Sequence, residues 1–178
     1  MATQHIIFLK GINVGGNNII RMEELRNILS QNSFEKITTV IQSGNIILSS
    51  EKTVEEVKAS IHEIIQANFD LNIPVIVSNK VEIEAALKDF PFYDKSDDES
   101  QLHITFLERE VTQEEWNERF LSIITNESYK LNKRILYLFT PKGYHKSKLN
   151  ASTIASKLGV NATNRNLKTL KKVLDKTN

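Results

Sequence analysis

The first eighty residues alternate between two hydrophobic periods. Four short apolar blocks, rich in β-branched residues, predict strands at residues 5–9, 38–41, 46–48 and 73–77. Between them, apolar residues recur at three- and four-residue steps and predict helices at residues 22–30 and 54–69. The second helix follows Thr53-x-x-Glu56, which is a capping box. The predicted order is therefore strand, helix, strand, strand, helix, strand.

The same order recurs in the second half of the chain. Strands are predicted at residues 102–107, 129–131, 135–139 and 160–163. A second capping box, Thr112-x-x-Glu115, begins a helix. The apolar face of that helix consists of Trp116, Phe120, Ile123 and Ile124. A further helix follows a cap at Asn150 or Ser152 and ends at Gly159, and the spacing at 167–174 predicts a last one. No sequence identity between the halves is evident, so the repeat is one of pattern.

Two strand–helix–strand–strand–helix–strand runs in tandem predict an α+β fold of two ferredoxin-like (βαββαβ) halves with antiparallel sheets. We expect an N-terminal half at residues 1–80, which contains a Gly-rich loop, and a C-terminal half at residues 101–178, which ends in basic helices. Residues 81–100 are interpreted as a connecting segment. Its stretch at 94–100 is polar, acidic and without periodicity, as expected of a linker or an exposed loop.

Composition excludes several kinds of chemistry. The chain of 178 residues has no cysteine, which rules out disulfides, thiolate nucleophiles and cysteine-ligated metals. Its four histidines lie far apart and show no metal-ligand spacing, so neither a metal site nor a cofactor is predicted. No secretory signal is visible, and no apolar run is long enough to cross a bilayer. We therefore expect a cytoplasmic protein without a membrane partner.

The net charge of +1 conceals a segregation along the sequence. From residue 129 onward there are 12 basic residues and one acidic residue, a local charge of +11. Residues 1–128 hold 11 basic and 21 acidic residues, a local charge of −10. Such asymmetry is typical of a protein with an anionic partner, including nucleic acid. Solvated basic helices, or attraction between the two halves, would explain it equally well.

Three polar segments carry the candidate chemistry. The loop at 11–18 lies between a strand and a helix, where backbone amides can bind an anion, but it lacks the Lys and the hydroxyl of a nucleotide-binding loop. The segment at 42–45 places Ser43 at a strand junction without the Gly-x-Ser-x-Gly pattern of hydrolases. The segment at 162–166 contains Arg165, whose planar guanidinium suits a phosphate or carboxylate, and Thr163 or Asn164 could cap the following helix.

The segments at 9–17, 41–46 and 162–166, together with Ser147-Lys148-Leu149, resemble the bacterial domain-of-unknown-function 1697 family. The resemblance runs from the first strand to the last helix. It implies two ferredoxin-like halves and a family without an established biochemical function. The sequence departs from the family at Leu167, where members usually carry Trp. Because the segments recur as a set, we expect one shared ligand-binding site. Its residues would be Lys10, Gly11, Asn13, Gly15, Gly16, Asn17, Ser43, Gly44, Asn45, Arg165 and Asn166.

The leading hypothesis is that the protein binds a small anionic or nucleotide-like ligand at this Gly/Asn-rich site. Apart from Lys10 and Arg165 the side chains are neutral, which suits binding better than acid–base catalysis. Two alternatives stay open: a nucleic-acid-binding module that uses the basic C-terminal region, and a transferase or hydrolase with its site around Ser43. The residues do not decide whether the protein is an enzyme, name no catalytic group and do not set the oligomeric state.

Overall fold

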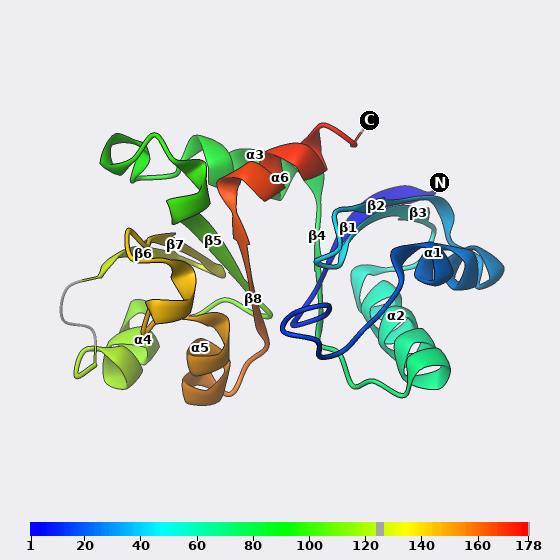
Figure 1. Cartoon of the computed structure of the whole chain (residues 1–178), viewed down its shortest axis with the longest axis horizontal. Helices are drawn as coiled ribbons and strands as arrows, with labels where there is room; N and C mark the ends of the chain where they lie inside the picture. Colours follow the sequence, from blue (N-terminus) through cyan, green and yellow to red (C-terminus); the bar gives the residue numbers. More distant parts are fainter. Residues whose placement is uncertain (124–126, 178) are drawn as a thin grey trace. The chain divides into compact units, whose positions relative to one another are not determined.

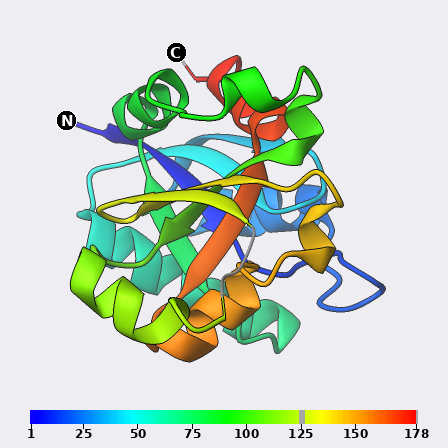
Figure 2. The same cartoon turned by 90° about the vertical axis from the view of Figure 1, so that its left-hand side faces the viewer.

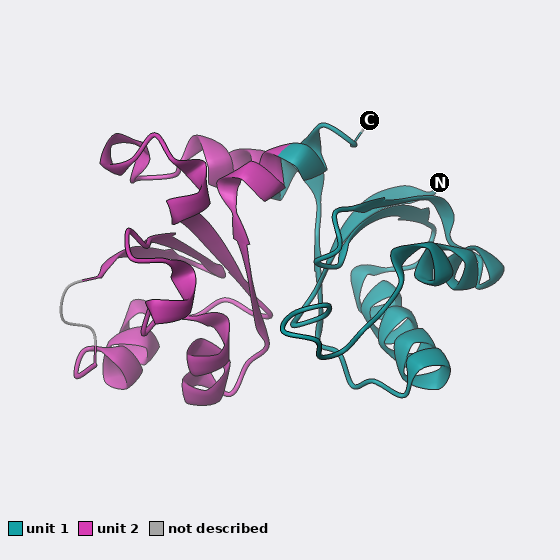
Figure 3. Ribbon diagram, in the orientation of Figure 1, with its two compact units in different colours: residues 1–83, 172–178 teal, residues 84–171 magenta. Residues whose placement is uncertain are grey.

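The computed structural model describes residues 1–123 and 127–177. The chain divides into two compact units, residues 1–83 with 172–178 (unit 1) and residues 84–171 (unit 2), as Figure 3 shows. This division assigns residues 84–100, part of the predicted connecting segment, to unit 2. Two helices, α3 (Lys80–Lys88) and α6 (Leu167–Leu174), contain the boundaries between the two units, so each helix has residues in both. Each unit is described by itself below.

Unit 1 contains one four-stranded antiparallel sheet and two helices (Figure 1). Its elements are β1 (Thr3–Leu9), α1 (Met22–Gln31), β2 (Glu35–Val40), β3 (Asn45–Ser50), α2 (Val54–Phe69) and β4 (Val75–Ser78). The strand order is β2-β3-β1-β4. One face of the sheet packs against α1 and α2 in a core that includes Ile7, Leu9, Leu25, Ile46 and Ile61. The opposite face is buried as well, with Ile6 and Phe8 fully enclosed, which explains the uninterrupted apolar block in β1.

Unit 2 repeats this arrangement, and Figure 2 views it from its own side. Its repeated elements are β5 (Leu102–Leu107), α4 (Gln113–Phe120), β6 (Ser128–Asn132), β7 (Ile135–Phe139), α5 (Ala151–Leu158) and β8 (Ala162–Asn166). The strand order is β6-β7-β5-β8, again antiparallel throughout. The core under α4 and α5 includes Leu107, Trp116, Phe120, Leu138 and Ile154. The structure is thus a mixed α+β fold with two four-stranded antiparallel sheets.

The first strands of the two units have nearly the same sequence, which corrects the expectation that no identity links the halves. β1 reads His-Ile-Ile-Phe-Leu from His5, and β5 reads His-Ile-Thr-Phe-Leu from His103, so four of five residues are identical. Their pairing agrees as well, because His5 lies opposite Leu48 and His103 lies opposite Leu138. The match is short, and it becomes visible only once both segments are known to occupy the same place in equivalent sheets.

The predicted elements are found with few changes in their bounds. Thr53 caps α2 in a complete capping box, and Gly159 ends α5 in a left-handed conformation. The helix α3 lies mostly in the segment at 81–100, where the sequence pattern predicts a connection without a helix. Asn79 accepts a hydrogen bond from the amide of Glu82 at 2.9 Å, and Ile83 is fully buried. Two short 3₁₀ turns, η1 (Tyr93–Lys95) and η2 (Glu99–Gln101), complete this segment.

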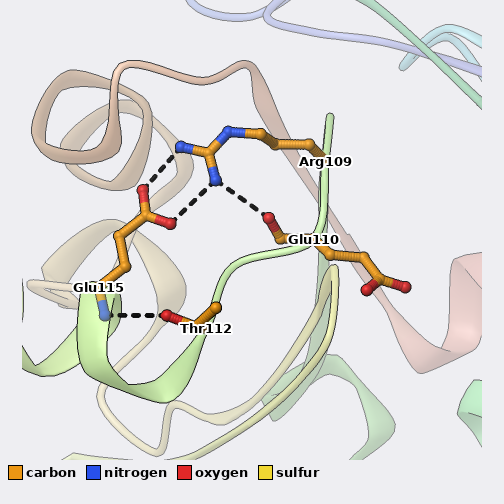
Figure 4. A network of polar contacts seen from close by, with 4 residues as sticks. All are labelled: Arg109, Glu110, Thr112 and Glu115. Atoms are coloured by element: carbon orange, nitrogen blue, oxygen red, sulfur yellow. Dashed lines mark hydrogen bonds and ion pairs between the residues drawn. The ribbon is translucent and has the colours of Figure 1, made fainter.

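The second capping box forms only in part (Figure 4). Thr112 Oγ1 accepts a hydrogen bond from the amide of Glu115 at 3.2 Å. A complete box would also have the Glu115 carboxylate accept a hydrogen bond from the amide of Thr112. The carboxylate instead binds the Arg109 guanidinium through two hydrogen bonds of 2.6 and 2.9 Å. This pairing lowers the pKa of Glu115 and raises the pKa of Arg109. The helix α4 ends at Phe120, earlier than predicted, and the predicted core residue Ile124 lies outside the described residues.

Candidate functional site

The Gly-rich loop of unit 1 is an exposed excursion held in place by its asparagines. Asn13 has a left-handed backbone, with φ of 54°, and its Oδ1 accepts a hydrogen bond from the amide of Ile20 at 2.9 Å. Its Nδ2 donates to the carbonyls of Ile20 and Gln42, at 2.9 and 2.8 Å. Asn18 Nδ2 donates to the Gly11 carbonyl at 2.9 Å. These amides satisfy backbone groups that the irregular loop leaves unpaired.

The tip of this loop contains Gly15, Gly16 and Asn17 on its exposed surface. The amide of Asn17 donates to the Val14 carbonyl at 3.0 Å and closes a tight turn. At the base of the loop, Lys10 is partly buried, and this burial lowers the pKa of its ammonium group. The tip therefore has the conformation of a turn, and the one lysine of the predicted site in this segment, Lys10, lies at the base of the loop.

The turn between β2 and β3 contains the second predicted segment. Asn45 is fully buried, and its Nδ2 donates to the Val40 carbonyl at 2.9 Å and to Ser43 Oγ at 3.0 Å. The Gly44 carbonyl accepts a hydrogen bond from the amide of Leu9 at 2.8 Å. An amide supplies no general base, so the Asn45 contact does not activate Ser43 as a nucleophile. Through the Asn13–Gln42 bond, unit 1 brings the first two predicted segments together.

The third predicted segment lies in unit 2 and forms the strand β8, which is followed directly by the last helix. Arg165 is buried, and burial lowers the pKa of its guanidinium to about 10. Its Nη1 donates to Thr163 Oγ1 at 2.9 Å and to the Asn164 carbonyl at 2.7 Å. A single site that also includes Arg165 and Asn166 stays a prediction.

The start of the helix α6 differs from the sequence expectation. Asn166 Oδ1 accepts a hydrogen bond from the amide of Thr169 at 2.8 Å, so Asn166 is the cap, and the expected caps Thr163 and Asn164 are not. Both of those residues make other contacts within the sheet. Leu167, where the family resemblance leads us to expect Trp, is fully buried. The departure from the family pattern therefore falls on a core position.

A polar cluster lies inside unit 2 where β5 and β8 pair. His103 Nδ1 donates to Asn164 Oδ1 at 2.8 Å, and Asn164 Nδ2 donates to Thr105 Oγ1 at 2.9 Å. The ring of Tyr144 stacks on His103, with centroids 4.9 Å apart and planes inclined by 24°. Tyr144 accepts a hydrogen bond from the amide of Ala151 at 2.6 Å, and burial raises the pKa of its hydroxyl to about 12. The cluster thus pairs His103 Nδ1, Asn164, Thr105 and Tyr144 within unit 2, whereas His103 Nε2 is buried without a hydrogen-bond partner among the described residues.

The equivalent pair in unit 1 is entirely apolar. Thr105 and Asn164 lie opposite each other in unit 2, and Ile7 and Val77 occupy the same places in unit 1. The two strand frameworks are otherwise paired alike. The polar cluster is thus a specific feature of unit 2, and sequence reasoning missed it. The shared His-Ile-x-Phe-Leu strand was the signal that could have located it.

Acid is expected to destabilise the fold through this cluster. Burial lowers the pKa of His103 below its ordinary value of 6.5, and the hydrogen bond to Asn164 offsets this in part. Below pH 6.5, His103 binds a proton in the unfolded chain but not in the folded chain. The free energy of unfolding therefore decreases as the pH falls. Between pH 7.5 and 5.5 we expect a loss of about 1 kcal/mol from His103 in urea unfolding. The variant His103→Phe should show a weaker dependence. Unchanged pH dependence in that variant would contradict the assignment, because burial shifts the pKa of His5 in the same direction.

A basic pocket of about 320 Å³ opens in unit 2, and sequence reasoning did not assemble it. It is lined by Glu127, Ser128, Phe139, Thr140, Pro141, Lys142, Gly143, Lys146, Ser147 and Lys148. The short turn η3 (Tyr144–Lys146) folds back on Gly143, whose carbonyl accepts a hydrogen bond from the amide of Lys146 at 3.1 Å. Lys142, Lys146 and Lys148, which are separated along this loop, all belong to the lining of the pocket. The sequence signal was the family segment Ser147-Lys148-Leu149, two residues of which line the pocket.

Glu127 is the acidic residue of this lining. Its Oε1 accepts a hydrogen bond from the amide of Lys148 at 3.0 Å. Its Oε2 is buried and has no hydrogen-bond partner among the described residues. A buried carboxylate oxygen without a donor is costly, because it has lost its water and gained nothing in exchange. The lining of the pocket therefore contains lysines, hydroxyls and one carboxylate, whose Oε2 is itself buried.

Folding removes most of the charge segregation seen along the sequence. Unit 2 holds 14 basic and 12 acidic residues, a net charge of +2, and unit 1 holds nine and ten, a net charge of −1. Acidic and basic residues of unit 2 also meet in ion pairs. Lys171 pairs with Glu99, and Lys133 lies 3.7 Å from Glu110. The basic residues thus do not form a uniformly basic half. Their contribution to binding an anion is expected to be local, in the pocket.

Two further observations concern the described part of the chain. No group of three or more His, Asp or Glu side chains within it could hold a metal ion. None of its helices has both the length and the apolar character that crossing a membrane requires.

Comparison with solved structures gives a match to the conserved bacterial protein SP0830 from Streptococcus pneumoniae. The alignment has a TM-score of 0.73 and 22% sequence identity and covers 99% of each chain. At this identity the similarity concerns the fold. No curated protein gives a significant match. The family model for proteins of unknown function (DUF1697) matches residues 2–137, a region that ends before Ser147-Lys148-Leu149 and β8. Because this match covers well over half of the sequence, the chain belongs to the DUF1697 family, for which no specific function is known.

Proposed function

We propose that this protein binds a small phosphate-bearing anion in the basic pocket of unit 2. The observation that carries the proposal is that Lys142, Lys146 and Lys148 line one cavity of about 320 Å³. Lys ammonium groups bind phosphate through charge-assisted hydrogen bonds, which are roughly twice as strong as neutral ones. The cavity lies within the size range of small-molecule sites. This keeps the predicted ligand class but gives the ligand another principal site.

The hydroxyls around the lysines fit the same ligand class. Ser128, Thr140 and Ser147 also line the cavity, and a hydroxyl can donate a hydrogen bond to a phosphate oxygen. At the start of α5, the amides of Ala151 and Thr153 already donate hydrogen bonds to Tyr144 and Asn150. These two amides therefore do not serve as donors to the anion. The anion would therefore be held by side chains rather than by a helix terminus.

We also propose that each unit is a ferredoxin-like half, as the sequence pattern predicts. Both units follow the order strand, helix, strand, strand, helix, strand. When the strands of each unit are numbered from its own first strand, both sheets have the strand order 2-3-1-4. Both properties are typical of the split βαβ arrangement and support this proposal. In unit 2, the same topology places the pocket beside the edge strand β6, at the end of β7.

The test is calorimetric titration with inorganic pyrophosphate as the probe. We expect the triple variant Lys142→Ala, Lys146→Ala and Lys148→Ala to lose about a hundredfold in affinity, since three charge-assisted contacts disappear. The matched control replaces Lys133, Lys157 and Lys168, which are exposed lysines of unit 2 outside the pocket. It removes the same charge and should change affinity by less than about threefold, because exposed charges act weakly at a distance. Equal losses in both variants would refute a specific site.

The two alternative functions gain less support. A nucleic-acid partner would be favoured by a continuous basic surface, and the 12 acidic residues of unit 2 argue against a uniformly basic one. A transferase or hydrolase around Ser43 needs a general base, and the amide of Asn45 is not one. Both hypotheses, like the role of the Gly/Asn-rich residues in ligand binding, stay predictions.

A further inference from the structure

We propose that the anion is a ribonucleoside monophosphate, an inference that rests on the proposed function of the same pocket. The lining has two chemistries. Lysines and hydroxyls make up one part, whereas Phe139 and Pro141 add apolar surface. A bare phosphate gains nothing from apolar surface. A phosphate attached to a planar base does, because a base can stack on an aromatic ring and bury its faces.

Glu127 supplies the second argument. A carboxylate in a cavity of lysines repels a phosphate and weakens its binding, so its position there needs a reason. Its Oε2 is buried and unpaired among the described residues, while its Oε1 is held by the Lys148 amide. A fully ionised phosphate has no hydrogen to donate. The hydroxyls of a ribose are donors, and an acidic side chain is a common partner of ribose hydroxyls in nucleotide sites. Glu127 is the acidic residue of the lining, and its carboxylate is the group that would accept hydrogen bonds from a ribose.

The size of the cavity limits the ligand to a single nucleotide. Its volume of about 320 Å³ lies at the lower end of the range for small-molecule sites, roughly 300–1,000 Å³. A nucleic-acid strand needs instead an extended groove that follows its backbone. The same lysines thus favour a mononucleotide over an oligonucleotide.

Four probes separate the parts of this inference in calorimetric titrations: inorganic phosphate, ribose 5-phosphate, adenosine 5′-monophosphate and its 2′,3′-dideoxy analogue. We expect the monophosphate to bind about tenfold more tightly than ribose 5-phosphate, owing to stacking of the base. We expect it to bind about tenfold more tightly than the dideoxy analogue, owing to the ribose hydroxyls.

Two substitutions assign these preferences to residues. Glu127→Gln keeps an acceptor for the Lys148 amide and should abolish most of the preference for ribose over dideoxyribose, without weakening inorganic phosphate. Glu118→Gln, on an exposed residue outside the pocket, is the matched control and should leave the preference unchanged. Phe139→Leu should reduce the monophosphate to the affinity of ribose 5-phosphate. Thermal unfolding of each variant shows that it is folded.

The outcomes distinguish this inference from the proposed function. If inorganic phosphate binds, and the monophosphate binds no more tightly than ribose 5-phosphate or than the dideoxy analogue, the nucleotide assignment is wrong and the anion site stands. If Glu127→Gln keeps the ribose preference, the role of Glu127 is overturned. If neither inorganic phosphate nor pyrophosphate nor the monophosphate binds the wild-type protein, both proposals fail.

Discussion

Replacing Gly44 with alanine is expected to destabilise the fold by about 3 kcal/mol. Gly44 has φ of 76°, a left-handed conformation that costs an L-residue about 1–2 kcal/mol. An added Cβ would also lie 2.7 Å from Leu9 Cβ and 2.8 Å from Ile12 Cδ1, and both neighbours are fully enclosed in the core. Neither can retreat without disturbing β1 or the Gly-rich loop, so a further cost of about 1–3 kcal/mol follows from overpacking.

The matched control for this substitution is Gly16→Ala. Gly16 has nearly the same φ, 79°, but no atom lies within 4 Å of the position that its Cβ would take. It therefore measures the backbone cost alone, about 1 kcal/mol. Urea unfolding followed by circular dichroism gives both values. If the two variants are equally destabilised, the close approach of Gly44 to Leu9 and Ile12 is not what makes glycine necessary there.

The contrast between Gly44 and Gly16 shows how far the sequence alone could be interpreted. The spacing of apolar residues was enough to place β1 and β3, since each is a local block and its period depends on neighbours in the chain. The cap of α2 was equally local, because Thr53 and Glu56 are three residues apart. By contrast, the reason for glycine at position 44 is a contact with Leu9, 35 positions away, which no local pattern records.

The candidate site divides along the same line. Asn13 and Asn45 are predicted as ligand-binding residues because their segments are polar and irregular, which is a local property of the sequence. Their partners are the carbonyls of Ile20, Gln42 and Val40, and these contacts give both side chains a role in holding turns. The pocket was missed for the opposite reason. Its lysines lie in an ordinary basic loop, and only the fold brings them into the lining of one pocket together with Glu127 and Phe139.

The polar pair that replaces two apolar residues in unit 2 leads to the second large effect. Asn164→Leu is expected to destabilise the fold by about 3 kcal/mol. The substitution removes the hydrogen bonds of the Asn164 side chain to His103 Nδ1, to Thr105 Oγ1 and, at 3.5 Å, to the Ile104 carbonyl, so each of these groups loses a partner inside the core. Each buried polar group left without a partner costs about 1–3 kcal/mol. The added apolar surface of leucine, which replaces a polar side chain of similar size, offsets only part of this loss.

A double-mutant cycle with His103→Phe distinguishes this explanation from a simple loss of packing. Phenylalanine keeps the ring that stacks on Tyr144 but has no Nδ1 to be left without a partner. The double variant should therefore be less destabilised than the sum of the single ones, with a coupling of about 1–2 kcal/mol, as expected for residues in direct contact. Chemical unfolding at pH 7.5, where His103 is neutral, measures the cycle without a contribution from its titration. Strict additivity would mean that the two side chains are not hydrogen-bonded. The apolar pair of Ile7 and Val77 in unit 1 would then be the better guide to what stabilises unit 2.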